Sequence, residues 1–266
     1  MKFVVLSDLH LGLPGQAVNG LDPAARLVAA VETINRDHAN ADFVAVAGDL
    51  ADLGAPEAYV QLQAILAGLT MPVHITMGNH DDPANYLAVF GAEHNDAEGR
   101  MSKVIDLDGH RVILLDTSTE GSHGGALCAG RQHWLAAKLD EAADRPVIVV
   151  MHHHANVLSL PVDEIPLADG VGFARLLKRH PDVRMVISGH VHLTTCGVWH
   201  GVPMTTLAGS HYSVNAHLPG MAGTQARLEG PAQMAVVLAD ADGVVVHFQD
   251  ILPRHIELAA GLFDWI

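Results

Sequence analysis

Runs of apolar residues recur along this chain, and several of them end in a polar residue. Such runs are KFVVLSDLH (2–10), DFVAVAGD (42–49), VHITMGNH (73–80), PVIVVMH (146–152) and RMVISGHVH (184–192). Their wealth of Val, Ile, Leu and Ala is typical of buried strands in a layered α/β domain. In such sheets, ligands gather where the carboxyl ends of the strands meet loops. We therefore expect the polar residues to collect at one edge.

The segments between these runs predict the rest of the fold. Helices are expected over 23–38, 56–67, 83–90, 131–142 and 172–180. Asp22 is the expected cap of the first helix, with Pro23 in its first turn. A hairpin is expected about Asp108-Gly109, and strands over 203–208, 233–239 and 243–249 are expected to close a second sheet. The predicted fold class is α/β, a four-layer αββα sandwich of two mixed β-sheets flanked by helices.

The polar residues at the strand ends have the chemistry of a binuclear metal site. They are Asp8, His10, Asp49, Asn79, His152, His190 and His192. Imidazole suits Zn, Fe and Ni, and carboxylate and carbonyl oxygens suit Mn and Mg, so the set fits two divalent ions without selecting one. Mn, Fe, Zn and Co are all candidates. Asp49 is the expected bridge between ions about 3.5–4 Å apart, because Gly48 lets the backbone turn tightly into the site.

At these residues the chain resembles the calcineurin-like metallophosphoesterases. The signature of that family is D-x-H, GD, GNH[DE], a lone His and GHxH. This chain has the five blocks in order, as Asp8-Leu9-His10, Gly48-Asp49, Gly78-Asn79-His80-Asp81, His152 and Gly189-His190-Val191-His192. The resemblance covers residues 2 to about 208 and is highly specific, because every block stands at a strand end.

The resemblance implies a role for each of these residues. The first ion would take Asp8, His10, Asp49 and His192, and the second Asp49, Asn79, His152 and His190. A hydroxide between or on the ions would attack phosphorus. His80 would face the phosphate and either stabilise the pentavalent transition state or help to protonate the departing alkoxide.

Each block taken alone has a simpler explanation. A lone Asp at a strand end usually caps a helix or forms a turn, and a lone His is more often a hydrogen-bonded polar residue than a ligand. The chain also departs from the family, because many relatives have HHPP where this one has His152-His153-His154-Ala155. His152 is the expected ligand, since it directly follows the strand, and His153 is the alternative.

The sequence indicates the substrate less directly. The run 56–59, the extended block 78–86 and the stretch after His152 look closest to bacterial glycerophosphodiesterases and class III cyclic-nucleotide phosphodiesterases. We therefore expect hydrolysis of a small phosphodiester, a glycerophosphodiester or a cyclic nucleotide. A phosphomonoesterase, a phosphonate monoester hydrolase or a nuclease of the same fold could share every ligand. A His in a similar loop of these relatives implies that His211 contacts the substrate, and a polar loop residue facing solvent is the alternative.

The net charge of the chain restricts the classes of molecule that it is expected to bind. The formal charge is −15, whereas a broad nucleic-acid footprint needs a basic stripe. Two divalent ions would still bring four positive charges to the site and attract a small anionic substrate locally. A non-catalytic protein of this fold is a further alternative, but it should have lost ligands, and none is lost here.

The chain is long enough for one domain over 1–266, with the Gly-, Pro- and Ala-rich stretch 209–232 as a cap or substrate loop. No apolar run is long enough to cross a membrane, and no cleavable signal is expected. Cys128 and Cys196 make no disulfide framework, so a cytoplasmic location is expected. A homo-oligomer is left open, because the loop 209–232 and the apolar segment 258–266 offer contact surface, while such a tail can equally fold back on its own domain.

Overall fold

Helices and strands alternate along most of the computed structural model, which describes residues 1–92 and 100–252. The helices are α1 (Pro23–Asp37), α2 (Pro56–Leu66), α3 (Pro83–Phe90), α4 (Ala129–Asp140), the 3-10 helix η2 (Pro161–Glu164) and α5 (Gly170–Leu177). The strands are β1 (Lys2–Leu6), β2 (Phe43–Ala47), β3 (Val73–Thr76), β4 (Lys103–Leu107), β5 (His110–Leu115), β6 (Val147–Met151), β7 (Val183–Ser188), β8 (Thr195–Trp199), β9 (Val202–Thr206), β10 (Ser213–Val214), β11 (Arg227–Leu228), β12 (Gln233–Ala239) and β13 (Val244–Asp250).

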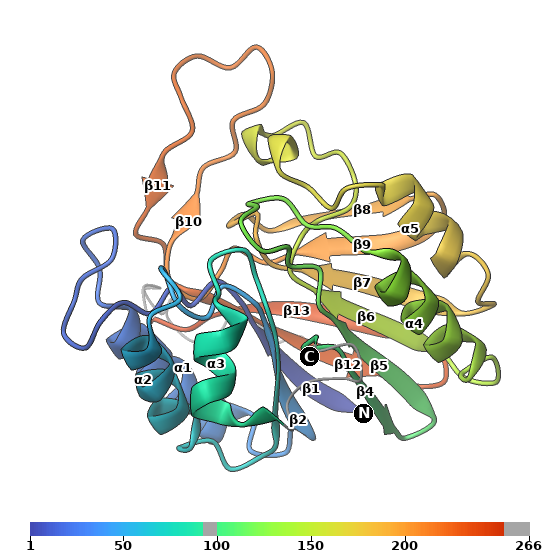
Figure 1. Cartoon of the computed structure of the whole chain (residues 1–266), viewed down its shortest axis with the longest axis horizontal. Coiled ribbons are helices and arrows are strands. Elements are labelled where there is room, and N and C mark those ends of the chain that lie inside the picture. Colours follow the sequence, from blue (N-terminus) through green and yellow to red (C-terminus); the bar gives the residue numbers. More distant parts are fainter. Residues whose placement is uncertain (93–99, 253–266) are drawn as a thin grey trace, which may run out of the picture.

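The strands form two large mixed sheets and one small ribbon. The first sheet has the order β13-β12-β1-β2-β3, in which β1, β2 and β3 run parallel. The second has the order β4-β5-β6-β7-β9-β8, in which the four inner strands run parallel. β10 and β11 pair only as a short antiparallel ribbon, which projects away from both sheets (Figure 1).

The inner strands of the two large sheets are covered on both faces, which explains why β2 and β6 are apolar throughout. Along β1, Val4 and Leu6 pack in a core cluster with residues of α1 and α2, such as Leu27. Phe3 and Val5 belong instead to the cluster between the two sheets. A third cluster lies between the second sheet and helices α4 and α5, on the other side of the molecule (Figure 1). The four-layer αββα prediction is therefore confirmed.

Local sequence signals account for several element ends. The Asp22 side chain accepts a hydrogen bond from the backbone N–H of Ala25, with Pro23 at the start of α1 as predicted. The hairpin is also confirmed, since Leu107 of β4 pairs with His110 of β5. Asp108 and Gly109 both have positive φ, the geometry of a two-residue turn that matches strand twist.

The predicted partners of the last strands are wrong. β9 joins the second sheet, but β12 pairs with β1 and β13 with β12, so both extend the first sheet. β8, at the edge of the second sheet, has no counterpart in the sequence prediction. Hydrophobic alternation indicates which side chains are buried, but it does not name the neighbouring strand.

The predicted long loop 209–232 contains the β10–β11 ribbon. The apolar segment 258–266 lies outside the described residues. Within residues 1–92 and 100–252, no helix combines the length and apolar character that a membrane crossing requires.

Candidate metal centre and active site

Every predicted ligand follows the carboxyl end of a parallel strand. Asp8 and His10 follow β1, Asp49 follows β2, Asn79 follows β3, His152 follows β6, and His190 and His192 follow β7. The first three strands belong to one sheet and the last two to the other. A hydrogen bond of 2.9 Å from the backbone N–H of His190 to Asp8 Oδ1 joins the two groups. The site therefore lies where the ends of the two sheets meet.

The backbone at these positions is unusual. Asp8, His10, Asp49, His190 and His192 all have positive φ, between 46° and 70°. Side chains other than Gly rarely adopt this region, and each such residue typically costs about 1–3 kcal/mol. The surrounding fold keeps all five residues in this strained conformation, and strained residues of this kind cluster at functional sites.

Gly48 has a steric reason to be glycine. Its φ is +82°, and a Cβ atom there would lie 2.6 Å from the backbone N of Gly78 and 2.8 Å from His152 Nδ1. The loops that carry Asp49, Asn79 and His152 can approach one another only because no side chain stands at this position.

The first group of ligand atoms consists of Asp8, His10, Asp49 and His192, which are all buried. These atoms lie within 4.8 Å of one another. His192 Nε2 is 3.4 Å from Asp8 Oδ1, and His10 Nε2 is 3.6 Å from Asp49 Oδ2. The set of four predicted for the first ion is thus brought together.

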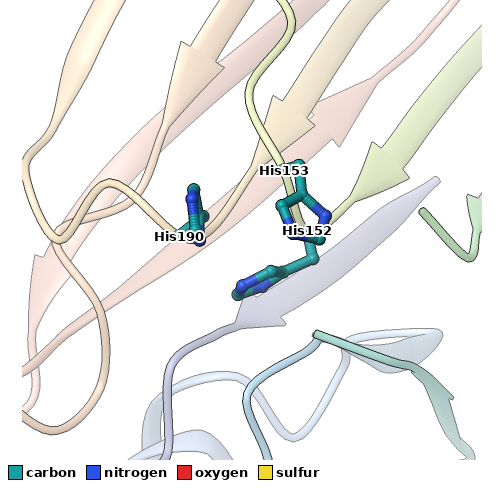
Figure 2. Close-up of side chains that lie close together, drawn as sticks. All are labelled: His152, His153 and His190. Carbon is teal, nitrogen blue, oxygen red and sulfur yellow. The ribbon is translucent and has the colours of Figure 1, made fainter. Parts of the chain in front are cut away.

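The second group surrounds His152. Its Nε2 atom lies 3.2 Å from Asn79 Oδ1 and 3.3 Å from Asp49 Oδ1. His152 and His153 reach in from the loop after β6, and His190 reaches in from the loop after β7 (Figure 2). Asp49 therefore directs one oxygen toward each group, as a bridging carboxylate must.

His152 and His153 have different surroundings. His153 Nδ1 is 2.8 Å from Thr117 Oγ1, and its Nε2 is 3.2 Å from the backbone oxygen of His123. Both of its nitrogens thus have partners in the protein. His152 Nδ1 lies 2.8 Å from the backbone oxygen of Ala47, whereas the partners of its Nε2 are Asn79 and Asp49, which are themselves predicted ligands. This arrangement favours His152 over His153 as the ligand.

The polar atoms fit a cation. Asp8 is 0% exposed, and its Oδ2 has no hydrogen-bond partner, although a buried carboxylate oxygen normally has one. His152 Nδ1 donates to Ala47 and His192 Nδ1 donates to Tyr212 O at 2.9 Å, which leaves Nε2 of each neutral ring with a lone pair. Metal-bound histidines are typically oriented by such second hydrogen bonds.

Charges in this pocket shift pKa values in opposite directions. Burial opposes ionisation of Asp49, but the charges of His152 and His10 hold its pKa well below the usual range. Burial likewise disfavours the charged form of His152, but Asp49 raises the pKa of His152 to about 9. Burial lowers the pKa values of His190 and His192. At the Asp49–His152 pair, the attraction between opposite charges therefore outweighs the effect of burial.

His80 lies beside the ligands and lines the main cavity. Its backbone N–H donates to Asp49 Oδ1 at 3.0 Å, and its Nδ1 lies 2.7 Å from the backbone oxygen of Asp52. A carbonyl oxygen can only accept, so Nδ1 is the protonated nitrogen in this contact.

His211 occupies a different environment from the one the sequence suggested. It is 0% exposed and is not among the cavity-lining residues. Its Nε2 lies 3.0 Å from the backbone oxygen of Val18, and its Nδ1 has no partner. The alternative of a solvent-facing loop residue is therefore wrong, and contact with the substrate stays a prediction.

A cavity of about 550 Å³ opens over both groups of ligands. Tyr212 lines it and stacks on His192, with ring centroids 4.0 Å apart. Arg227 of β11 also lines it, with its guanidinium 5.5 Å from the centre of the Tyr212 ring. Pro161, Val162 and Ile165 form an apolar part of the lining. Sequence reasoning missed both Tyr212 and Arg227, because neither stands in a motif.

Asp81 ends the Gly78-Asn79-His80-Asp81 motif, but the sequence did not reveal its role. Its carboxylate accepts hydrogen bonds from the backbone N–H groups of Leu50, Ala51 and Gly78 and from the Tyr59 hydroxyl. Burial and the charge of Asp49 raise the pKa of Asp81 to about 6. Asp81 therefore ties the loop after β2 to the loop after β3.

Comparison with known proteins agrees with this geometry. A family model described as calcineurin-like phosphoesterase matches residues 1–193. The chain belongs to the calcineurin-like phosphoesterase family. Proteins of this family use divalent metal ions, and the Asp and His clusters described above supply candidate ligands for them in this chain.

Individual relatives extend over most of the chain. A Rhodopseudomonas palustris protein named "probable cyclic nucleotide phosphodiesterase" is 37% identical over 93% of this chain and 91% of its own length. The glycerophosphodiester phosphodiesterase GpdQ of Enterobacter lignolyticus is 29% identical over 80% of this chain and 79% of its own length. The crystal structure of a dimetal phosphatase from Danio rerio has a TM-score of 0.72 and 18% identity, and covers 94% of this chain and 96% of its own. That structural likeness shows a common fold.

Proposed function

We propose that this chain is a two-metal phosphodiesterase that hydrolyses a small phosphodiester, either a cyclic nucleotide or a glycerophosphodiester. The observation that carries the proposal is the position of Asp49. Its Oδ1 is 3.3 Å from His152 Nε2, and its Oδ2 is 3.6 Å from His10 Nε2. One carboxylate thus faces two separate groups of ligand atoms, as a binuclear centre requires.

The ligands divide between two ions. Asp8, His10 and His192 would hold the first, Asn79, His152 and His190 the second, and Asp49 both. Two divalent ions there would neutralise phosphate charge and make a water molecule acidic enough to serve as nucleophile at neutral pH. Mn, Fe, Zn and Co all fit this mixed set of N and O donors.

His80 would act on the phosphate group. It lines the cavity next to Asn79, and its Nε2 is available for proton exchange. A protonated His80 would donate to a phosphate oxygen or to the departing alkoxide, and general acid help of this kind is typically worth about 10²–10⁴-fold.

The lining of the cavity supports a small substrate. Its volume of about 550 Å³ is within the range of about 300–1,000 Å³ that is usual for small-molecule sites. The net charge of −15 disfavours long nucleic acids. Tyr212 and Arg227 come from the stretch 209–232, which we propose as a substrate wall within one domain over 1–266. We also propose a cytoplasmic location, because Cys128 and Cys196 are both free.

A hydrolysis panel tests the proposal. Metal-loaded protein would be assayed with bis(p-nitrophenyl) phosphate, p-nitrophenyl phosphate, a phosphonate monoester, 3′,5′- and 2′,3′-cyclic nucleotides, glycerophosphodiesters and a DNA duplex. We expect the highest kcat/KM on a cyclic nucleotide or a glycerophosphodiester. Higher kcat/KM on a monoester or a phosphonate, or cleavage of DNA alone, would replace this function by one of its relatives. No hydrolysis of any compound would favour a non-catalytic role.

A further inference from the structure

His123 lies beside a proposed metal ligand although no motif marks it. It stands in the loop between β5 and α4, is exposed, and lines the main cavity together with His80. The centroids of these two rings are 6.0 Å apart. His123 Nδ1 is 3.4 Å from Asn79 Nδ2. The hydrogen on this amide nitrogen makes it the donor, so Nδ1 of His123 must be the acceptor.

This contact bears on which end of the Asn79 amide can reach an ion. Only Oδ1 carries lone pairs for coordination, whereas Nδ2 carries two protons. In the present orientation, Oδ1 is 3.2 Å from His152 Nε2 and Nδ2 faces His123. A half-turn of the amide would bring Nδ2 to the ion and, in the tautomer of His123 that has a lone pair on Nδ1, set Oδ1 against that lone pair. Both consequences disfavour the flipped amide.

The backbone oxygen of His123 is in turn contacted by the buried side chain of His153. His153, which is 0% exposed, lies with Nε2 3.2 Å from the His123 backbone oxygen and Nδ1 2.8 Å from Thr117 Oγ1. Nε2 then donates to the carbonyl, and the Thr117 hydroxyl donates to Nδ1. Neighbouring histidines thus act on the same amide from two sides: His152 faces Asn79 Oδ1, and His153 fixes the loop that carries the partner of Asn79 Nδ2.

We propose that His123 is a positioning residue that holds the Asn79 amide with Oδ1 toward the second metal position. The proposal rests on the assignment of Asn79 as a ligand in the proposed function. It concerns only the second ion, because His123 contacts Asn79, and Asn79 is assigned to that ion alone. Partners that orient a ligand typically change metal affinity by about 10–100-fold when removed.

Three substitutions separate this role from a general structural one. His123→Ala removes the acceptor. His123→Asn restores the acceptor, because Oδ1 of Asn is separated from Cα by the same number of bonds as Nδ1 of His. His123→Gln carries its oxygen one atom further out, where Nε2 would be. His133→Ala, on the exposed side of α4, is the matched control.

The readout is calorimetric titration of each metal-free protein with Mn²⁺, with stoichiometry and both affinities fitted. We expect two ions in the wild type and in His133→Ala. His123→Ala and His123→Gln should bind one ion normally and the other about 10–100-fold more weakly, and His123→Asn should recover most of the loss.

Two results would overturn the inference while leaving the proposed function intact. One is two ions bound by His123→Ala as tightly as by the wild type. The other is a loss of affinity that His123→Asn fails to restore. A wild-type protein that binds fewer than two ions would contradict the proposed function itself, and this inference with it.

Discussion

The Nε2 atoms of His10 and His192 lie 3.2 Å apart. His192 donates through Nδ1 to the backbone oxygen of Tyr212, and His10 Nδ1 lies 3.3 Å from Asp52 Oδ1. In two neutral rings of these tautomers, both Nε2 atoms carry lone pairs that face each other. Such an approach is unfavourable, so either a proton on the Nε2 of His10 or a cation beside both atoms must balance it.

Asp49→Ala should remove both ions and nearly all hydrolysis. Asp49 is the one residue assigned to both metal positions, with an oxygen near His10 and another near His152. Elemental analysis of the purified variant against the wild type measures this directly. One ion retained at full occupancy would exclude Asp49 as the bridge.

His80→Ala should lower kcat by about 10²–10⁴-fold on a diester with an alkyl leaving group and leave the metal content unchanged. The loss should be smaller for a p-nitrophenolate leaving group, which hardly needs a proton. Comparing kcat for the two classes of ester checks the role. Equal losses on both would assign His80 to stabilisation of the transition state rather than to protonation of the alkoxide.

His211→Ala should reduce stability, because it removes a buried side chain and its hydrogen bond to the backbone oxygen of Val18, which then accepts only from the backbone N–H of Leu21. The net contribution of one such hydrogen bond is about 0.5–1.5 kcal/mol, which urea unfolding can detect. The same variant tests the substrate contact predicted from the sequence. If the contact exists, the substitution should raise KM for a phosphodiester by a larger factor than it raises KM for a small phosphomonoester. An unchanged KM for every diester would remove His211 from the substrate site.

His74→Phe should change how stability depends on pH. Burial and the charge of Lys103 lower the pKa of His74 from 6.5 to about 4. A base with a lower pKa in the folded state binds fewer protons there than in the unfolded chain, so protonation favours unfolding. The wild type should therefore lose stability as pH falls from 6.5 toward about 4, with no further loss from this group below that.

The Phe variant keeps the ring contact with Phe43, whose centroid is 5.5 Å from that of His74, and lacks the titrating group. Its free energy of unfolding should fall less steeply over the same pH range. Parallel curves for the two proteins, measured by urea unfolding at several pH values, would contradict the assignment.

Much of the fold could be predicted from the sequence because the signals are local. Apolar runs bounded by Gly, Asp and His marked β1, β2 and β7 closely, and Asp22 marked the start of α1. Sheet membership of β12 and β13 could not be predicted, because it depends on which distant strand offers a free edge. The β10–β11 ribbon has only two residues in each strand, too few for a periodic pattern.

The candidate site likewise contains some residues that could be predicted from the sequence and others that could not. Asp8, Asp49 and His190 stand in short blocks at strand ends, so topology alone predicts that they meet. His123 stands in a loop and Arg227 in a two-residue strand, and only the tertiary fold brings them to the cavity. For His211 the sequence left two side-chain directions open, because a loop position alone does not fix the direction of a side chain.

Metal-dependent hydrolysis tests the two-metal account most directly. Wild-type protein stripped with a chelator would be titrated with Mn²⁺ while hydrolysis of bis(p-nitrophenyl) phosphate is followed. The account predicts negligible hydrolysis without metal and a rise that reaches its plateau at two equivalents of Mn²⁺ per chain. Full hydrolysis by the stripped protein, or a plateau at one equivalent, would contradict it.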